Sequence, residues 1–136
     1  MMKEERPDEA ASARRQTEAQ RIMSELQAAE SRIQAMQWVS LDGRVIASMA
    51  SALDADRVGA MSASLLALSR AAGREMELGN LHQVIINGEQ RTVVFIDAGR
   101  ERVLMIAADN QINLGRLLIH AQQTSQKLAA LTQPPG

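Results

Sequence analysis

The chain has 136 residues, a length typical of one domain, and its 15 basic and 16 acidic residues leave a net charge of −1. This balance, with one Trp, one Phe and no Tyr, removes the basic surface and the stacking side chains on which nucleic-acid binding depends. Cysteine is absent, which excludes disulfides, thiolate metal sites and thiol nucleophiles. The N-terminus is too charged for a signal peptide, and the longest apolar run, residues 103–108, is far shorter than the roughly 20 residues of a membrane span. We therefore expect a cytoplasmic protein that neither inserts into a membrane nor binds nucleic acid.

The N-terminal part of the chain predicts a disordered leader and then a helix. Residues 1–11 are charged and contain a proline, so we expect no fixed structure there. From Ser12 to about Gln37 apolar side chains recur at intervals of three and four, which indicates an amphipathic helix. The apolar positions of this stripe are Ile22, Leu26, Ala29, Ile33 and Met36.

A hairpin and a long central helix are expected next. Short strands at residues 37–41 and 44–49 flank the pair Asp42-Gly43, which is typical of a two-residue hairpin turn. Asp54 has the side chain of a helix N-cap, and Gly79 marks the end of the helical region that follows.

The C-terminal half predicts three strands and a final helix. Strands are expected at residues 81–87, 91–97 and 102–108, and their interiors are continuously apolar, which is typical of a sheet covered on both faces. The last helix is expected to begin near Asn110, capped by Asp109 or by Asn110 itself. Its inward positions are Leu114, Leu117, Leu118, Ala121, Leu128 and Leu131. The pattern predicts an α+β domain over residues 12–131 with an antiparallel sheet, followed by a tail over residues 132–136.

The central helix contains a stretch without charge, residues 58–69. The larger side chains follow helical spacing and are expected to face the core: Val58, Met61, Leu65, Leu68, Ala72 and Met76. The opposite face is expected to point outward and consists of Gly59, Ala60, Ala63, Leu66, Ala67 and Ala71. Because charges would be normal on an exposed face, we predict that a second chain covers it. The alternative is a stable surface helix, since Ala is the best helix former.

Residues that could carry catalysis do not form a recognisable set. The chain lacks a phosphate-binding loop, and neither histidine has metal-ligand spacing: His82 is expected on an edge strand and His120 at a solvated helix position. Carboxylates fall at predicted turns and caps. We therefore expect a protein that is not an enzyme and that needs no cofactor and no metal.

Three segments, residues 39–48, 58–66 and 108–118, together with the order of elements, resemble the roadblock/dynein light-chain family, a relative of the longin fold. The resemblance covers roughly residues 22–131. It implies a five-stranded antiparallel sheet with the middle helix on one face and the terminal helices on the other. It also implies a homodimer that joins third strands and pairs middle helices. Many bacterial members of this family regulate small Ras-like GTPases and others are scaffolds, so the resemblance implies one of these two roles.

The leading interpretation is a dimeric, non-enzymatic regulator or scaffold for a small Ras-like GTPase. An adaptor that assembles a complex without contacting a GTPase remains open, and a ligand-sensing domain is disfavoured by the near absence of aromatic and convergent polar groups. Exposed cations beside the helix are expected to orient the partner, with an arginine finger as the less favoured alternative. The remaining interface residues are these cations and positions on the third strand: Arg57, Arg70, Arg74, His82, Val84 and Ile86.

Overall fold

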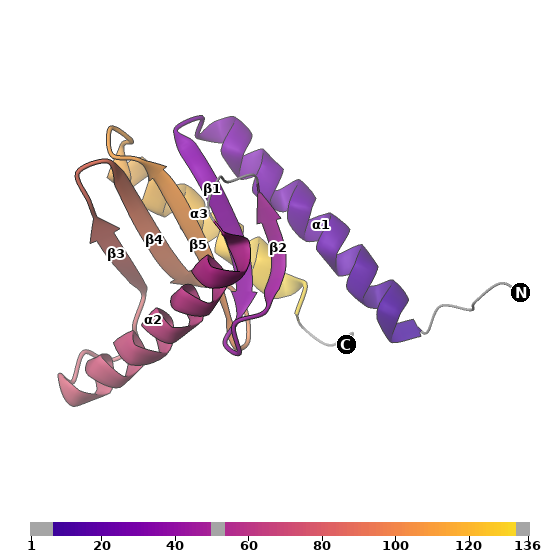
Figure 1. Ribbon diagram of the computed structural model, residues 1–136, viewed down its shortest axis with the longest axis horizontal. Coiled ribbons are helices and arrows are strands. Elements are labelled where there is room, and N and C mark those ends of the chain that lie inside the picture. The colour runs from indigo at the N-terminus through magenta and orange to yellow at the C-terminus, as the bar shows by residue number, and fades with distance from the viewer. Residues whose placement is uncertain (1–6, 50–53, 133–136) are drawn as a thin grey trace, which may run out of the picture.

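A computed structural model describes residues 7–49 and 54–132. Its elements, in chain order, are α1 (Pro7–Ala29), β1 (Ile33–Ser40), β2 (Val45–Met49), α2 (Ala55–Glu75), β3 (Gln83–Asn87), β4 (Arg91–Asp97), β5 (Arg102–Asp109) and α3 (Leu114–Ala130). The five strands form one antiparallel sheet in the order β2-β1-β5-β4-β3 (Figure 1). The predicted order of elements and fold class are confirmed.

Two hydrophobic clusters lie on the two faces of the sheet. The larger one packs α1 and α3 against the sheet and includes Met23, Trp38, Ile106 and Leu117, all buried. The smaller one lies under α2 and includes Leu66, Val103 and Met105. β5 is the central strand and is buried from Val103 to Ala108, which explains its continuously apolar sequence.

The N-terminal helix differs from its predicted bounds at both ends. It begins at Pro7, where the fixed φ of proline suits the first helical position, so residues 7–11 are helical and not disordered. It ends at Ala29, and residues 33–36 belong to β1. The prediction was wrong there because β1 is buried on both faces over most of its length, so its apolar positions also fit helical spacing. The predicted division into leader, domain and tail remains a prediction, and residues 1–6 and 133–136 lie outside the described part of the chain.

One predicted turn and the predicted start of the last helix are also corrected. The first hairpin closes with a three-residue loop, in which the Gly43 amide donates to the Ser40 carbonyl and the Ser40 amide donates to the Arg44 carbonyl, both at 2.9 Å. Gly43 has a φ of 90°, the left-handed conformation that such a loop requires, whereas Asp42 does not. The last helix begins at Leu114 with Asn113 as its N-cap, because Asp109 instead accepts a hydrogen bond from the Gln111 amide and closes a preceding turn.

The remaining bounds agree closely with the sequence. β4 is as predicted, β5 extends one residue further, and β3 begins at Gln83, so His82 lies just outside it. Over residues 7–49 and 54–132, none of the helices combines the length and the apolar character that crossing a lipid bilayer requires.

Candidate interaction surface

The start of α2 is fixed by local hydrogen bonds. The Asp54 carboxylate accepts from the Arg57 amide at 3.1 Å, which confirms the predicted N-cap. The buried Gln37 of β1 donates through Nε2 to the Ala55 carbonyl at 2.9 Å. These contacts fix the first turn of the helix and hold it against β1.

Small residues bring the first half of α2 close to the sheet. Gly59 and Ala63 are buried, and a Cβ added at Gly59 would lie only 2.7 Å from Cγ2 of Val45 on β2. Because a glycine faces the strand, the helix backbone approaches β2 more closely than any larger side chain would allow. The most extensive contacts of α2 are therefore with β1, β2 and β5.

The predicted inward and outward faces of α2 are reversed at several positions. Met61 and Leu68 are 70% and 67% exposed, and Met76 is exposed as well, although all three were predicted to face the core. Conversely, Gly59, Ala63 and Leu66 were predicted to point outward and are buried against the sheet. The prediction failed because it assumed that the larger side chains fill the core, whereas close packing favours the small ones here.

The other predicted interface residues lie around this helix. The exposed ones are Arg57, Ala60, Ala67, Arg74, His82 and Ile86, and the half-buried ones are Arg70, Ala71 and Val84. Arg70 forms an ion pair with Asp97 at 2.5 Å, so this cation is already partnered within the chain. The role of these residues in an interface remains a prediction.

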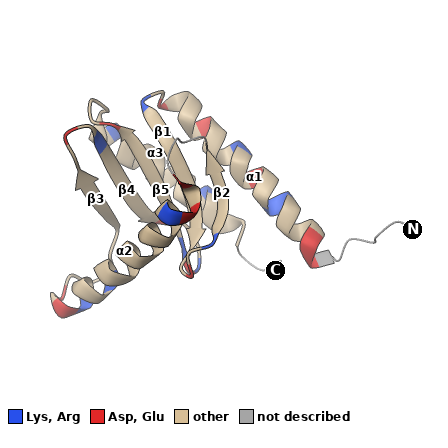
Figure 2. Cartoon of the chain, viewed as in Figure 1, with Lys and Arg blue, Asp and Glu red and all other residues tan. Residues whose placement is uncertain are grey.

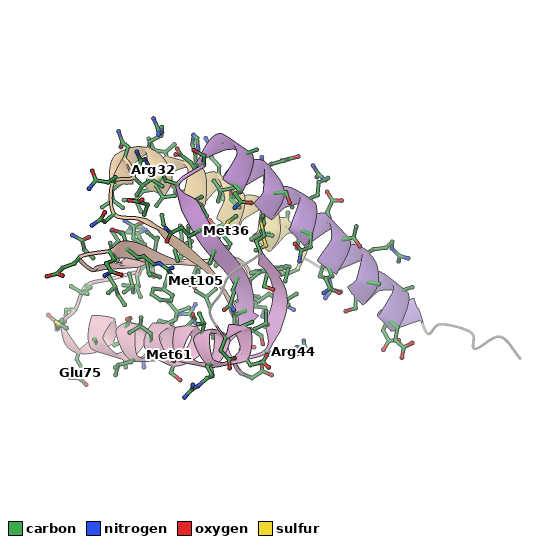
Figure 3. The ribbon with its side chains drawn as sticks, turned by 45° about the horizontal axis from the view of Figure 1, so that its top comes forward. Arg32, Met36, Arg44, Met61, Glu75 and Met105 are labelled. Atoms are coloured by element: carbon green, nitrogen blue, oxygen red, sulfur yellow. The ribbon has the colours of Figure 1, made fainter. Side chains whose placement is uncertain are left out.

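An apolar groove of about 690 Å³ opens between α2 and the β3–β5 side of the sheet. Its lining is Val58, Ala60, Met61, Ser62, Ser64, Leu65, Leu68, Ile86, Val93, Phe95, Met105 and Ala107. Figure 3 labels Met61 on α2 and Met105 on the sheet above it, the two sides of this groove. Figure 2 shows α2 free of charge along its middle, with charged residues only toward its two ends. The surface formed by this groove and the exposed apolar side chains of α2 is called the α2 surface below.

Residues 20–108 match the Roadblock/LC7 domain family. The chain belongs to this family. It is 33% identical over 112 residues to the uncharacterized protein MJ1340 of Methanocaldococcus jannaschii, a match that covers 82% of this chain and 96% of that protein. A Roadblock/LC7 domain from Streptomyces avermitilis has the same fold with a TM-score of 0.72 at 22% identity, over 79% of this chain and 91% of that one. The gliding protein mglB from Thermus thermophilus superposes with a TM-score of 0.77 at 17% identity, over 86% and 90% of the two chains.

A group of charged and polar side chains in this roadblock domain links the end of α1 to α3. Glu30 is 2% exposed, and its Oε1 accepts from Arg116 Nε at 2.7 Å and lies 3.4 Å from His120 Nδ1. The hydrogen bond from Arg116 lowers the pKa of Glu30 below its ordinary value, an effect that burial partly opposes. His120 is thus half-buried beside a carboxylate, which corrects its predicted solvated position. The ion pair between Glu30 and Arg116 therefore stabilises the packing of α3 against the end of α1.

Metal binding finds no support in the described part of the roadblock domain. Over residues 7–49 and 54–132, no three His, Cys, Asp or Glu side chains are grouped closely enough to hold an ion. The residues that sequence reasoning missed are Met61 and Leu68, the exposed apolar side chains. A usable signal was present: two glycines, Gly59 and Gly73, fall on the same side of the helix as Ala63 and Leu66, and both are buried.

Proposed function

We propose that this roadblock domain is a homodimeric, non-enzymatic regulator or scaffold that acts on a small Ras-like GTPase. Membership of the family supports the general role, and the α2 surface supports pairing of two chains. Met61 and Leu68 stand beside an apolar groove without charged neighbours along the middle of the helix. Monomeric proteins rarely leave such a continuous apolar area in water. This surface is the observation that carries the proposal.

A two-fold dimer would cover the α2 surface with the same surface of a second copy. In an isologous contact, Leu68 of one chain enters the groove of the other and the reverse contact forms by symmetry. Burying each such side chain contributes about 1.5–3 kcal/mol. β3 is an edge strand with exposed Ile86 on the groove side, so it is also free to extend the sheet into a second copy.

The oligomeric state tests the pairing directly. Light scattering after size exclusion should give twice the 14.8 kDa mass of the chain. Leu68→Glu should give the monomer mass, because a carboxylate would be desolvated in the contact. Ala67→Arg should act in the same direction from the neighbouring exposed position. Ile119→Glu on α3 is the matched control, since Ile119 is 60% exposed, close to the 67% of Leu68, but lies outside the groove, and it should leave the dimer intact.

A stable monomer of the natural chain at micromolar concentration would contradict the dimer. So would a Leu68→Glu variant whose mass and concentration dependence equal those of the Ile119→Glu control. Either result would leave the exposed apolar side chains of α2 as a site for a different protein.

The contact with a GTPase is proposed to involve the charged ends of α2. Arg57 and Arg74 are exposed at opposite ends of the helix, on either side of its uncharged middle. Arg70 is held by Asp97, which favours a role at the rim of the contact. If hydrolysis is accelerated, the chain repositions the catalytic groups of the GTPase itself, because binding energy can order a switch loop without donating a residue.

Binding and turnover with a small Ras-like GTPase encoded beside this chain test this part. The chain alone should not hydrolyse GTP and should not bind it in the manner of a GTPase, since it has no phosphate-binding loop. Arg57→Ala, Arg70→Ala and Arg74→Ala should each weaken association with the GTP-loaded partner and leave the hydrolysis rate at saturation nearly unchanged. Loss of about a thousandfold in that rate from one substitution would instead establish an arginine finger. Absence of binding would favour the adaptor function.

A further inference from the structure

Three arginines from distant parts of the sequence line one pocket at the end of the sheet where the β1–β2 hairpin turns. Arg15 comes from α1, Arg44 from the loop between β1 and β2, and Arg102 from the start of β5. They line a pocket of about 200 Å³ together with Ser12, Gln16 and the side chains of Val45 and Ile46. Figure 3 labels Arg44 at the end of the β1–β2 hairpin, at one edge of this pocket. We call it the arginine pocket.

Arg102 is held in place by the surrounding protein. Its guanidinium lies over the ring of the buried Trp38, 5.7 Å from the ring centroid, and its Nη1 donates to the Arg100 carbonyl at 3.1 Å. Its Nε is shielded from solvent and has no hydrogen-bond acceptor in the described part of the chain. These contacts hold the guanidinium at the pocket wall, and the unpaired Nε carries a desolvation cost.

The chain does not neutralise this cluster at short range. Within residues 7–49 and 54–132, no carboxylate oxygen lies within 4.0 Å of a side-chain nitrogen of Arg15, Arg44 or Arg102. Burial, followed by the charges of Arg15 and Arg44, lowers the pKa of Arg102 below its ordinary value.

Two carboxylates, Glu101 and Asp42, interact with these arginines through their charge without forming an ion pair. Glu101 acts on Arg102 without forming an ion pair with it. Asp42 accepts hydrogen bonds from the Ser40 hydroxyl and the Arg44 amide within its own turn. The pocket therefore keeps an excess of positive charge.

We propose that the arginine pocket binds a phosphoryl group, either as free phosphate or as a small phosphomonoester. Guanidinium groups present planar forks of donors that match phosphate oxygens, and three residues that carry them line this pocket. Ser12 and Gln16 add neutral hydrogen-bonding groups at the same wall. The pocket volume of about 200 Å³ is several times the roughly 30 Å³ that one water occupies in the liquid, so a phosphoryl group has room to enter. This function is separate from the proposed dimer and GTPase contacts and does not depend on them.

Isothermal titration of the full chain with inorganic phosphate and with O-phosphoserine tests the proposal. The titration is made at low ionic strength and about pH 8, where phosphoserine, with a second pKa of about 6, is a dianion. We expect saturable binding of at least one probe. Tighter binding of inorganic phosphate assigns free phosphate, and binding of phosphoserine that is equal or tighter assigns a phosphomonoester.

Single charge removals locate the site. Arg15→Gln and Arg44→Gln should each weaken binding about tenfold, the usual loss for one charge-assisted hydrogen bond. Arg91→Gln removes one positive charge from an exposed residue on β4 outside the pocket and should leave the affinity unchanged. Circular dichroism verifies the fold of each variant, and Arg102 is left unaltered because it packs on Trp38.

The proposal is overturned if neither probe saturates at millimolar concentration. It is also overturned if Arg91→Gln weakens binding as much as Arg15→Gln and Arg44→Gln do, because the attraction would then come only from the overall charge.

Discussion

Replacing Gly59 by alanine tests the observed orientation of α2 with a single methyl group. In an exposed helix interior this change stabilises a protein by about 0.8–1 kcal/mol, because alanine is the better helix former. At Gly59 the new methyl group would stand 2.7 Å from Cγ2 of Val45 and 3.4 Å from the Gly43 carbonyl oxygen. Non-bonded carbon atoms do not approach as closely as 2.7 Å, so the helix or the strand must move.

The two effects oppose each other, and the steric one should win. Forcing one extra methyl group into a packed site costs about 1–3 kcal/mol, which exceeds the gain in helix propensity. Val45 is β-branched and has few alternative rotamers, so it cannot easily move aside. We expect Gly59→Ala to lower the free energy of unfolding by about 1 kcal/mol. Shortening the obstructing side chain with Val45→Ala should reduce that loss in the double variant.

Gly73→Ala is the matched control in the same helix. A Cβ there would meet only Cδ1 of Leu78, at 3.9 Å, an ordinary van der Waals distance. This substitution should therefore raise the free energy of unfolding by about 0.5–1 kcal/mol. Urea unfolding followed by circular dichroism at one fixed protein concentration measures both variants, since dimerisation makes stability depend on concentration. If Gly59→Ala stabilises the chain as much as Gly73→Ala, then α2 does not pack on β2 through Gly59 and the argument fails.

Three further predictions concern the rest of the domain. Glu30→Gln should lower the free energy of unfolding by about 2 kcal/mol at neutral pH, measured by urea unfolding. Because Arg116 lowers the pKa of Glu30 below its ordinary 4.5, the wild-type contribution is present above that pH and is lost as the pH falls through the folded-state pKa, so the variant should lose less stability on acidification. Trp38→Phe removes the hydrogen bond from Nε1 to the Ala98 carbonyl at 2.8 Å and should cost about 1–3 kcal/mol by thermal unfolding; an unchanged melting temperature would contradict this. Asp54→Ala removes the N-cap of α2 and should cost about 1 kcal/mol in the same assay, whereas Asp54→Asn should retain most of the stability.

The sheet could be predicted from sequence because its signals are local. β4 and β5 are short apolar runs joined by a glycine-containing turn, and their predicted bounds agree with the structure almost to the residue. The boundary between α1 and β1 could not be predicted in the same way. β1 is buried on both faces, and Ile33 and Met36 continue the helical spacing of the preceding residues by coincidence. Only the packing of the two layers distinguishes a helix from a strand at such positions.

The candidate site was predicted only in part, because burial depends on which partner an element meets. The uncharged stretch of α2 correctly drew attention to this helix, but its two faces could not be assigned from size alone. Gly59 and Ala63 are buried because only small residues fit between the helix and the close sheet. The larger Met61 and Leu68 lie on the parts of the helix surface that do not face the sheet and are exposed. The arginine pocket brings together residues 15, 44 and 102, and a single sequence gives no sign of contacts at such separations.

The α2 surface and the arginine pocket are built on different helices, α2 and α1, and the β1–β2 hairpin touches both. Gly43 lies against Ala60 of α2, since a Cβ added at Gly43 would be 3.5 Å from the Ala60 Cα, and the next residue is Arg44 of the pocket. A phosphoryl group held by Arg44 would therefore restrain the loop on which the first turns of α2 rest. Any energetic coupling between anion binding and dimerisation would pass most directly through this loop. By linkage it must be reciprocal, so an anion that tightens the dimer must itself bind the dimer more tightly than the monomer.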